Sequence, residues 1–198
     1  GECNGDGADY ECWDGSYECD DSDCSDEPGD QPQYFTDLPN PTGESSLIII
    51  EDVIGLTIGD EVGLFDLSGV LETDTTGINP QYGETLVASG VWTGDQMELV
   101  AVMSIDLSDF NGPILNGAID GNDIVIRVWD QDLDHVHGAE ANYTQGNGTY
   151  GQILTVIDVL DTYVYGCTDP EALNYDGYAN MDDGSCNYTI EQSIDLLS

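Results

Sequence analysis

The sequence is almost without positive charge. Its 198 residues include one Lys or Arg, which is Arg127, and forty-one Asp and Glu, so the formal net charge is −40 at pH 7. Proteins that bind nucleic acids or anionic membrane surfaces do so through basic patches, and this chain cannot form one. Nucleic acid is therefore excluded as a partner.

Long apolar runs and catalytic motifs are also missing. No stretch of 18 apolar residues, no signal peptide and no initiator methionine is present, so we expect a processed, secreted chain without membrane insertion. G-x-S-x-G, H-E-x-x-H and phosphate-binding glycine loops do not occur. Among forty-one Asp and Glu, some pair will always lie at the carboxylate spacing of a glycosidase, so such a pair does not indicate glycoside hydrolysis. We expect that the protein is not an enzyme.

Cysteine is absent from the middle of the chain and concentrated at its ends. The six cysteines are Cys3, Cys12, Cys19, Cys24, Cys167 and Cys186. An even number in small terminal groups indicates disulfides, and therefore an oxidising, extracellular or cell-surface location. Zinc is the competing explanation, but zinc sites use C-x-x-C pairs and usually histidine, which these spacings do not supply.

The excess of negative charge has to be offset for the chain to fold compactly. Like charges at this density repel each other, and salt screens them only over a Debye length of about 10 Å at 0.1 M ionic strength. Hard divalent cations take carboxylate oxygens as ligands and the acids are clustered, so calcium (Ca2+) is the expected cofactor. The alternative is a halophile's solvated acidic surface.

Composition divides the chain into four parts. Residues 1–32 are Cys-rich and acidic, and residues 33–163 carry segments rich in Val, Ile, Leu and aromatics, separated by Gly, Asn, Asp and Pro. A disulfide-closed acidic loop at 164–188 and an apolar tail at 189–198 follow. Because no segment has helical periodicity, the expected fold is all-β: an antiparallel β-sandwich, of jelly-roll or immunoglobulin-like type, flanked by two small disulfide-tied, calcium-binding loop modules.

Two local patterns in the central part make specific structural predictions. "ETLVASGVW" and "MELVAVMSID", joined by "TGDQ", predict a hairpin of two long antiparallel strands. In "DIVIRVWD" the alternation puts Ile124, Ile126 and Val128 on one face and Val125, Arg127 and Trp129 on the other. Trp92 and Trp129 lie within these strand patterns and are expected in the core.

The segment "GCTDPEALNYDGYANMDDGSC", residues 166–186, is the main candidate for a metal site. A disulfide between Cys167 and Cys186 closes a ring of about 20 residues, which constrains the unfolded chain by about 3 kcal/mol. Few apolar residues hold the loop in shape, so calcium is expected to turn the repulsion between its carboxylates into attraction. The alternative is an ordinary acidic surface loop. The expected ligands are Asp169, Asn174, Asp176, Asn180, Asp182 and Asp183.

The same segment resembles a short repeat, approximately G-C-T-D-P-x-A-x-N-Y-D-x-x-A-x-x-D-D-G-S-C, of long secreted surface proteins of Bacteroidetes-like bacteria. The central part, with "PTGESSLIII", "IGDEVGLFD", "VASGVWTGDQMELVAV" and "IRVWD", resembles the domain that accompanies this repeat. The resemblance implies export, a cell-surface location and a β-rich fold, and it says little about ligands.

The N-terminal block "ECWDGSYECDDSDCSDEP" resembles calcium modules of the LDL-receptor class A type, although two of the usual six cysteines are missing. Four cysteines allow three pairings, and the resemblance implies Cys3 with Cys19 and Cys12 with Cys24. The candidate calcium ligands are Asp20, Asp23, Asp26 and Glu27 by this resemblance, and Asp6 and Asp9 as further oxygen donors in "NGDGAD".

A second acidic segment, "DQDLDHVHGAE" at 130–140, opens with the D-x-D-x-D spacing of a calcium loop. It departs from an EF-hand because His135 stands at the glycine position. A loop site through Asp130, Asp132 and Asp134 is one interpretation, and an ordinary acidic turn is the other. His135 and His137 share one side of a strand, where a transition-metal pair competes with a solvated turn.

The tail and the lone arginine bear on assembly. In "NYTIEQSIDLLS", Ile190, Ile194 and Leu196 share one face of an extended strand, and such a face has to pack somewhere. Arg127 is expected to pair with a carboxylate of its own chain or of a neighbouring subunit.

These features favour an extracellular structural protein, a calcium-stabilised subunit of a surface fibre or matrix. Copies would assemble head-to-tail when the tail from Thr189 to Leu197, or the stretch around Tyr34 to Leu38, adds a strand to an adjacent copy or domain. The alternative is a calcium-dependent glycan-binding or adhesion module of a larger secreted protein, with tryptophans or tyrosines as an aromatic platform. Candidate glycosylation sites are Asn142, Asn147 and Asn187.

Overall fold

The structure is a computed structural model, which describes residues 10–11, 17–18, 31–73 and 79–188. These residues form strands and loops, and their one helical turn is the 3₁₀ helix η2 (Ser108–Phe110). Within this part of the chain, no helix is long and apolar enough to span a membrane. The strands are β1 (Tyr10–Glu11), β2 (Tyr17–Glu18), β3 (Ser45–Ile50), β4 (Val53–Ile54), β5 (Glu61–Thr73), β6 (Pro80–Val91), β7 (Met97–Val102), β8 (Ile105–Asp106), β9 (Ile114–Leu115), β10 (Val125–Asp130), β11 (His135–Gly138), β12 (Glu140–Gln145), β13 (Leu154–Asp161), β14 (Tyr165–Gly166) and β15 (Met181–Asp182).

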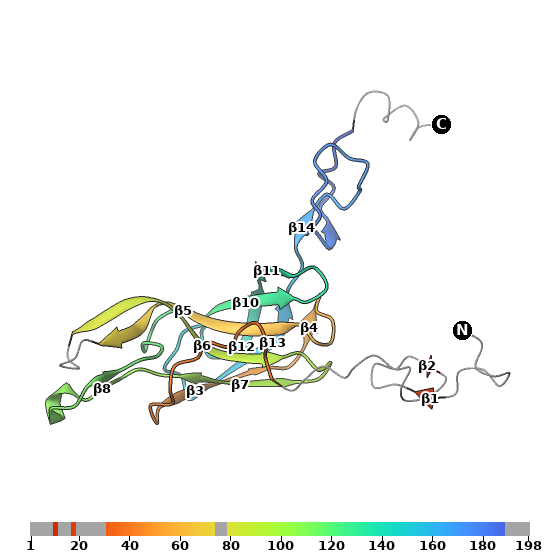
Figure 1. Cartoon of the computed structure of the whole chain (residues 1–198). Coiled ribbons are helices and arrows are strands. Elements are labelled where there is room, and N and C mark those ends of the chain that lie inside the picture. Colours follow the sequence, from red (N-terminus) through yellow and green to blue (C-terminus); the bar gives the residue numbers. More distant parts are fainter. Residues whose placement is uncertain (1–9, 12–16, 19–30, 74–78, 189–198) are drawn as a thin grey trace, which may run out of the picture.

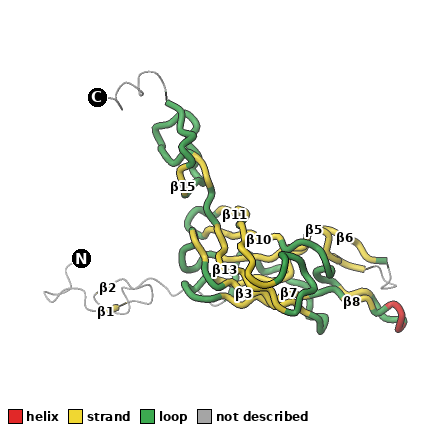
Figure 2. The backbone as a smooth tube through the Cα atoms, turned by 180° about the vertical axis from the view of Figure 1, so that it is seen from behind, coloured by secondary structure: helices red, strands yellow, loops and turns green. Residues whose placement is uncertain are grey.

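Two larger sheets make up the body of the molecule (Figure 1, Figure 2). The first sheet has the order β11–β10–β5–β6 and is antiparallel throughout. The second sheet has the order β12–β13–β3–β7, with β4 alongside β13. In it β13 pairs in parallel with β3 and β4, and the other pairs are antiparallel. The predicted all-β fold is therefore confirmed, and its sheets are antiparallel except where β13 pairs with β3 and β4.

One hydrophobic core fills the space between the two sheets. Ile48 of β3, Leu64 of β5 and Ile126 and Val128 of β10 belong to the same cluster, and each is at most 4% exposed. Burying a side chain of this size stabilises the fold by about 1.5–3 kcal/mol. The alternation predicted for β10 is confirmed, because Ile126 and Val128 face this core while Trp129 packs on the outer side of the sheet.

The hairpin predicted around "TGDQ" is wrong. β6 pairs with β5 in the first sheet and β7 pairs with β3 in the second, so the connection carries the chain from one layer to the other. Trp92, only 7% exposed, fills the core at this crossing. Packing is close, because a Cβ on Gly90 would lie 2.8 Å from the Leu99 side chain. A tight turn and a crossing between layers use the same residue types, so the local sequence does not distinguish them.

A second, smaller cluster covers the outer face of the first sheet. Phe35, from the segment 33–38 that we call the strap, packs there against Phe65 and Leu86. The rings of Phe35 and Phe65 meet edge to face with centroids 5.6 Å apart. The cluster also includes Trp129 at its margin. The strap thus gives the first sheet an apolar covering on its outer side.

The strap is anchored by the buried carboxylate of Glu61. This side chain, at the start of β5, is 2% exposed. Its oxygens accept the backbone N–H groups of Gln33, of Tyr34 at 2.9 and 3.0 Å, and of Phe35 at 2.8 Å. A buried carboxylate is costly unless several donors replace the lost water, and the strap supplies them. The hydroxyl of Ser89 adds a 2.8 Å hydrogen bond to the Phe35 carbonyl.

Replacing Glu61 by Ala should destabilise the body. The substitution leaves the N–H groups of residues 33, 34 and 35 without this acceptor, and a hydrogen bond to a charged group contributes about 1.5–3 kcal/mol. We therefore expect the free energy of unfolding to fall by about 3 kcal/mol, measured by urea unfolding with tryptophan fluorescence. Glu44→Ala, at an exposed position, is the control, and equal stability of the two variants would contradict the anchoring role.

Candidate functional site

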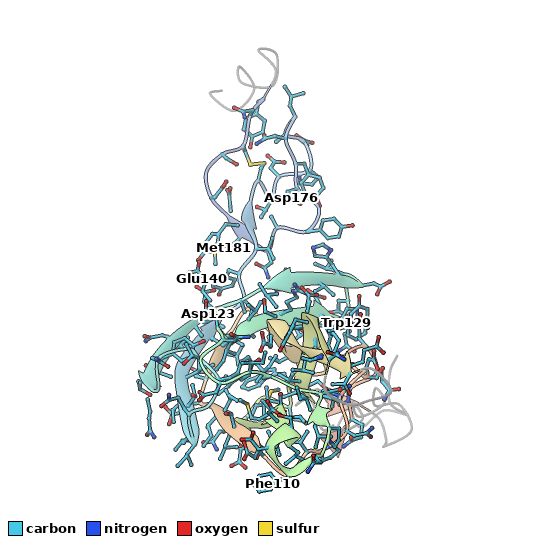
Figure 3. All side chains as sticks on the ribbon, turned by 90° about the vertical axis from the view of Figure 1, so that its left-hand side faces the viewer. Phe110, Asp123, Trp129, Glu140, Asp176 and Met181 are labelled. Carbon is cyan, nitrogen blue, oxygen red and sulfur yellow. A yellow bond between two sulfur atoms is a disulfide. The ribbon has the colours of Figure 1, made fainter. Side chains whose placement is uncertain are left out.

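The acidic segment that the sequence singles out forms a small terminal module. A disulfide joins Cys167 and Cys186, with 4.9 Å between their Cα atoms, and β14 pairs in parallel with β15. Cys167 is 1% exposed, and Ala172 is buried beside the loop. Figure 3 shows Asp176 and Met181 in this module, which projects from the body on the side opposite Phe110.

The aspartates of this module close its own turns. Four of them accept the backbone N–H two residues further along the chain, the pattern of an Asx turn. The pairs are Asp169 with Glu171 at 2.9 Å, Asp176 with Tyr178 at 3.0 Å, Asp182 with Gly184 at 3.0 Å and Asp183 with Ser185 at 2.8 Å. The carboxylates therefore take part in shaping the loop, each from its own position along the chain.

Two asparagine side chains, those of Asn174 and Asn180, bond to the backbone at the two ends of the module. The side-chain oxygen of Asn174 accepts the N–H of Asn187 at 2.7 Å, and its amide donates to the Ser185 carbonyl at 2.9 Å. Asn180 accepts the N–H of Val164 at 2.9 Å. The sequence has few apolar residues to hold this loop in shape, and these side-chain to backbone bonds hold it instead. The Asx-forming residue types themselves could have suggested such bonds.

The module does not gather its acids around one point. Among the described residues, no group of three or more His, Cys, Asp or Glu side chains is placed to hold a metal ion. Asp169 is engaged through both oxygens, because the hydroxyl of Tyr188 also donates to it at 2.7 Å. The hydrogen bonds from Glu171 and Tyr188 hold the pKa of Asp169 below its usual value. In Asp176, Asp182 and Asp183 the turn bonds engage Oδ1.

The second acidic segment also uses its aspartates in its own turn. Asp130 accepts the N–H of Leu133 at 2.9 Å, and Asp134 accepts the indole N–H of Trp129 at 3.2 Å. Asp134 adopts a φ of 47°, in the left-handed region, which aspartate tolerates better than most residues. Asp132 is exposed. The geometry is that of an ordered acidic turn leading into β11.

Both histidines lie on β11, on the same side of the strand as the sequence predicts, and they connect the body to the terminal module. The ring of His135 stacks on Tyr178 of the module, with centroids 3.9 Å apart and an interplanar angle of 20°. His137 lies behind it, 6.4 Å from the His135 ring. This stack brings Tyr178 of the module against β11, the edge strand of the first sheet.

The pKa of His137 lies below its usual value. Burial is the main cause, because it disfavours the charged imidazolium. The backbone of Thr162 and the charges of Asp130 and Asp60 act in the opposite direction, and His135 adds to the lowering. The neutral form of His137 is therefore the one that fits the folded protein.

The lone arginine pairs within its own chain. Both terminal nitrogens of Arg127 lie 2.7 Å from the carboxylate oxygens of Glu84 on β6, and the guanidinium sits 4.6 Å from the centre of the Phe65 ring. The pair lowers the pKa of Glu84 and raises that of Arg127 through these hydrogen bonds. Both side chains line a groove of about 660 Å³ between the strap, β5, β6, β10 and β11. We call it the strap groove; nothing in the sequence patterns pointed to it.

The remaining predicted positions fall in three groups. Asn142, Asn147 and Asn187 are exposed, as a glycosylation site requires. Cys3, Cys12, Cys19, Cys24, Asp6, Asp9, Asp20, Asp23, Asp26 and Glu27 lie outside the described residues, as do Ile190, Ile194 and Leu196. Of the aromatic candidates, Trp92 is in the core as expected, whereas Trp129, also expected there, is in the outer cluster beside the strap.

A scan against protein-family models found no matching family, and searches of curated proteins and of solved structures found no match. Inference about function therefore depends on the residues and their geometry.

We expect His137 to make folding stability depend on pH. The unfolded chain binds a proton near the ordinary pKa of 6.5, while the folded-state pKa is lower. Between these two values the unfolded state holds more protons, so stability falls as the pH drops below 6.5 and levels off below the folded-state pKa. Urea unfolding across this range should show the fall in the natural protein and a flatter profile in His137→Leu.

His135→Leu is the matched control, because it removes the neighbouring imidazole and leaves His137 in place. An equal pH dependence in the natural protein and in His137→Leu would mean that other groups cause it.

Proposed function

We propose that the protein is an extracellular structural subunit that assembles head-to-tail into a surface fibre or matrix and whose acidic charge is offset by calcium. The disulfide of the terminal module supports an oxidising environment. We also assign the body to the β-sandwich class, of jelly-roll or immunoglobulin-like type, because two sheets share one core. The observation that carries the proposal is the free edge of β7.

The four edge strands of the two sheets differ in how they are protected. β12 carries two register shifts against β13, β6 carries three against β5, and β11 is only four residues long. Irregular or short strands discourage pairing with another chain. β7, in contrast, pairs six residues with β3 without a shift, and Val100 at its centre is 58% exposed.

The outer side of β7 is suited to an added strand. Among the described residues, the backbone hydrogen bond that reaches this side of β7 is at its C-terminal end, where Ala118 donates to the Val102 carbonyl at 2.9 Å. Beside the N-terminal half of the strand runs a groove of about 290 Å³, lined in part by Gly90, Met97 and Leu99. Lysine, a common guard of exposed edges, does not occur in this chain. An extended segment placed here gains main-chain hydrogen bonds and an apolar contact.

The tail of a neighbouring copy is the segment that we assign to this edge. The stretch around Tyr34 to Leu38 is the other candidate, but its residues lie on their own sheet, with Phe35 only 6% exposed and tied to Glu61. The spacing of Ile190, Ile194 and Leu196 in the sequence would put them on one face if the tail is extended, which suits pairing along an edge with one apolar side. Donation that does not close a ring yields a filament.

In this proposal, bound calcium offsets the negative charge that would otherwise keep copies of the chain apart. A net charge of −40 disfavours contact between copies, and Arg127 with Glu84 is the ion pair found among the described residues. Because the terminal module's acids do not converge on one point, we propose that ions bind it from the surface. The carboxylates of Asp176, Asp182 and Asp183 are the proposed ligands there, since their turn bonds engage only Oδ1.

A charge on the free edge should weaken assembly. Val100→Lys places an ammonium on β7 at an exposed position, where the monomer tolerates it, and we expect the critical concentration for fibres to rise about tenfold, which is ~1.4 kcal/mol per contact. Negative-stain microscopy and sedimentation measure this. Phe110→Lys, at a position 82% exposed on η2, is the matched control, and a chain lacking residues 189–198 should stay monomeric. Fibres of normal length from both Val100→Lys and the chain lacking residues 189–198 would overturn the assignment.

Removal of calcium should loosen the fibres and lower the melting temperature in low salt. EDTA dialysis followed by elemental analysis, microscopy and thermal unfolding tests this, and re-addition of calcium should reverse it. Asp182→Asn is expected to reduce bound calcium, whereas Asp109→Asn on η2 serves as the charge-matched control. An unchanged melting temperature after exhaustive chelation, with no bound calcium before it, speaks against the role of the ion.

A further inference from the structure

The strap groove is a built feature of the outer face of the first sheet. Its volume of about 660 Å³ is within the range of small-molecule sites. One wall is the strap and the residues after it, which Glu61 and Phe35 hold in place. The other walls come from β5, β6, β10 and β11. The groove therefore exists before any ligand arrives.

One wall of the groove presents a fixed aromatic ring. Tyr34 is 50% exposed, and its ring lies flat on Trp129, with centroids 5.1 Å apart and an interplanar angle of 7°. Phe35 supports it edge-on at 5.2 Å. Trp129 and Phe35 thus hold the ring in place, and half of the Tyr34 side chain stays exposed where it lines the groove. A flat, immobilised ring of this kind stacks on the C–H face of a sugar ring, which is apolar and similarly flat.

The groove combines hydrogen-bond acceptors and donors close to apolar surface. Asp37 and Glu84 offer carboxylate oxygens, Asn40 and Asn116 offer amides, and Arg127 offers N–H groups. Sugar hydroxyls donate and accept at once, so they use such a mixture fully. An apolar ligand would leave these polar groups unpaired, at a cost for each group that becomes buried.

Charge decides what kind of polyhydroxy ligand fits. The guanidinium of Arg127 is already neutralised by the two 2.7 Å contacts to Glu84, and Asp37 adds a further negative charge to the lining. The whole chain carries −40. Anionic polysaccharides and acidic peptides are therefore repelled, and an uncharged ligand is not.

We propose that the strap groove binds a neutral polysaccharide. The site is separate from the free edge of β7, so this proposal stands whether or not copies of the chain assemble there. Tyr34 provides the stacking surface, and Asn116 and Asp37 are the polar groups that fix the sugar hydroxyls.

Affinity electrophoresis in native gels tests the proposal, since the high charge of the protein gives it strong mobility. The gels contain dextran, laminarin, xyloglucan or galactomannan, with alginate as the polyanion and a gel without polysaccharide as the reference for self-association. At least one neutral polymer should retard the protein, and alginate should not. Tyr34→Ala and Asn116→Ala should each weaken retardation about tenfold, a loss matching one stacking or hydrogen-bonding contact.

Tyr82→Ala is the matched control, because Tyr82 is 60% exposed on β6 and does not line the groove. Thermal unfolding of each variant shows whether it is folded. If Tyr34→Ala does not fold, retardation of Asp37→Ala, a substitution at an exposed position, tests the groove in its place. Three results would overturn the proposal: no neutral polymer retards the protein, alginate retards it as strongly, or the groove variants behave like Tyr82→Ala. Retardation already present in the reference gel would indicate that the groove serves a second copy instead.

Discussion

The hydrogen bonds between the Glu61 carboxylate and the strap determine how the outer face of the body is built. A carboxylate that is 2% exposed has to be satisfied by several donors, and in this chain no lysine is available to pair with it. The N–H groups of Gln33, Tyr34 and Phe35 take that role. They fix the backbone of the strap, which brings Phe35 onto Phe65 and lays Tyr34 on Trp129. The second apolar cluster and the strap groove both follow from this one anchoring.

The same solution recurs at the other two buried acids in the part of the chain that the structure describes. Asp60, 1% exposed, accepts the N–H groups of Thr57 and Gln131 at 2.8 and 3.0 Å, and desolvation raises its pKa against those bonds. Asp66, also 1% exposed, accepts the N–H of Ile119 at 2.9 Å. On the surface, the aspartates of the terminal module close Asx turns. A chain with almost no cations thus uses backbone donors where other proteins use ion pairs, and each such bond also fixes a loop.

The sequence predicted what depends on periodicity and little of what depends on single long-range bonds. The alternation in β10 correctly placed Ile126 and Val128 on the core face and Trp129 on the opposite face, although Trp129 itself was expected in the core and packs in the outer cluster. The crossing at Trp92 was predicted as a hairpin, because residues near "TGDQ" carry no information about which strand lies alongside β6. The strap groove was missed for the same reason: 28 residues separate Gln33 from Glu61. The available signal was Glu61, a charged residue at a position of β5 that should be buried. Such a residue requires hydrogen-bond donors from elsewhere in the chain.

The arrangement of the two proposed surfaces keeps them from competing. A strand added to β7 extends the second sheet in its own plane, whereas the strap groove lies on the outer face of the first sheet, across the core from β7. Strand addition consumes main-chain groups at an edge and leaves the faces of both sheets accessible. A filament built this way would present one groove per subunit along its length, and a weak neutral-sugar contact repeated at regular spacing binds a polymer far more strongly than any single site. Each groove then needs only a low affinity for the sugar. An open site with a few polar groups around one aromatic ring can provide such an affinity.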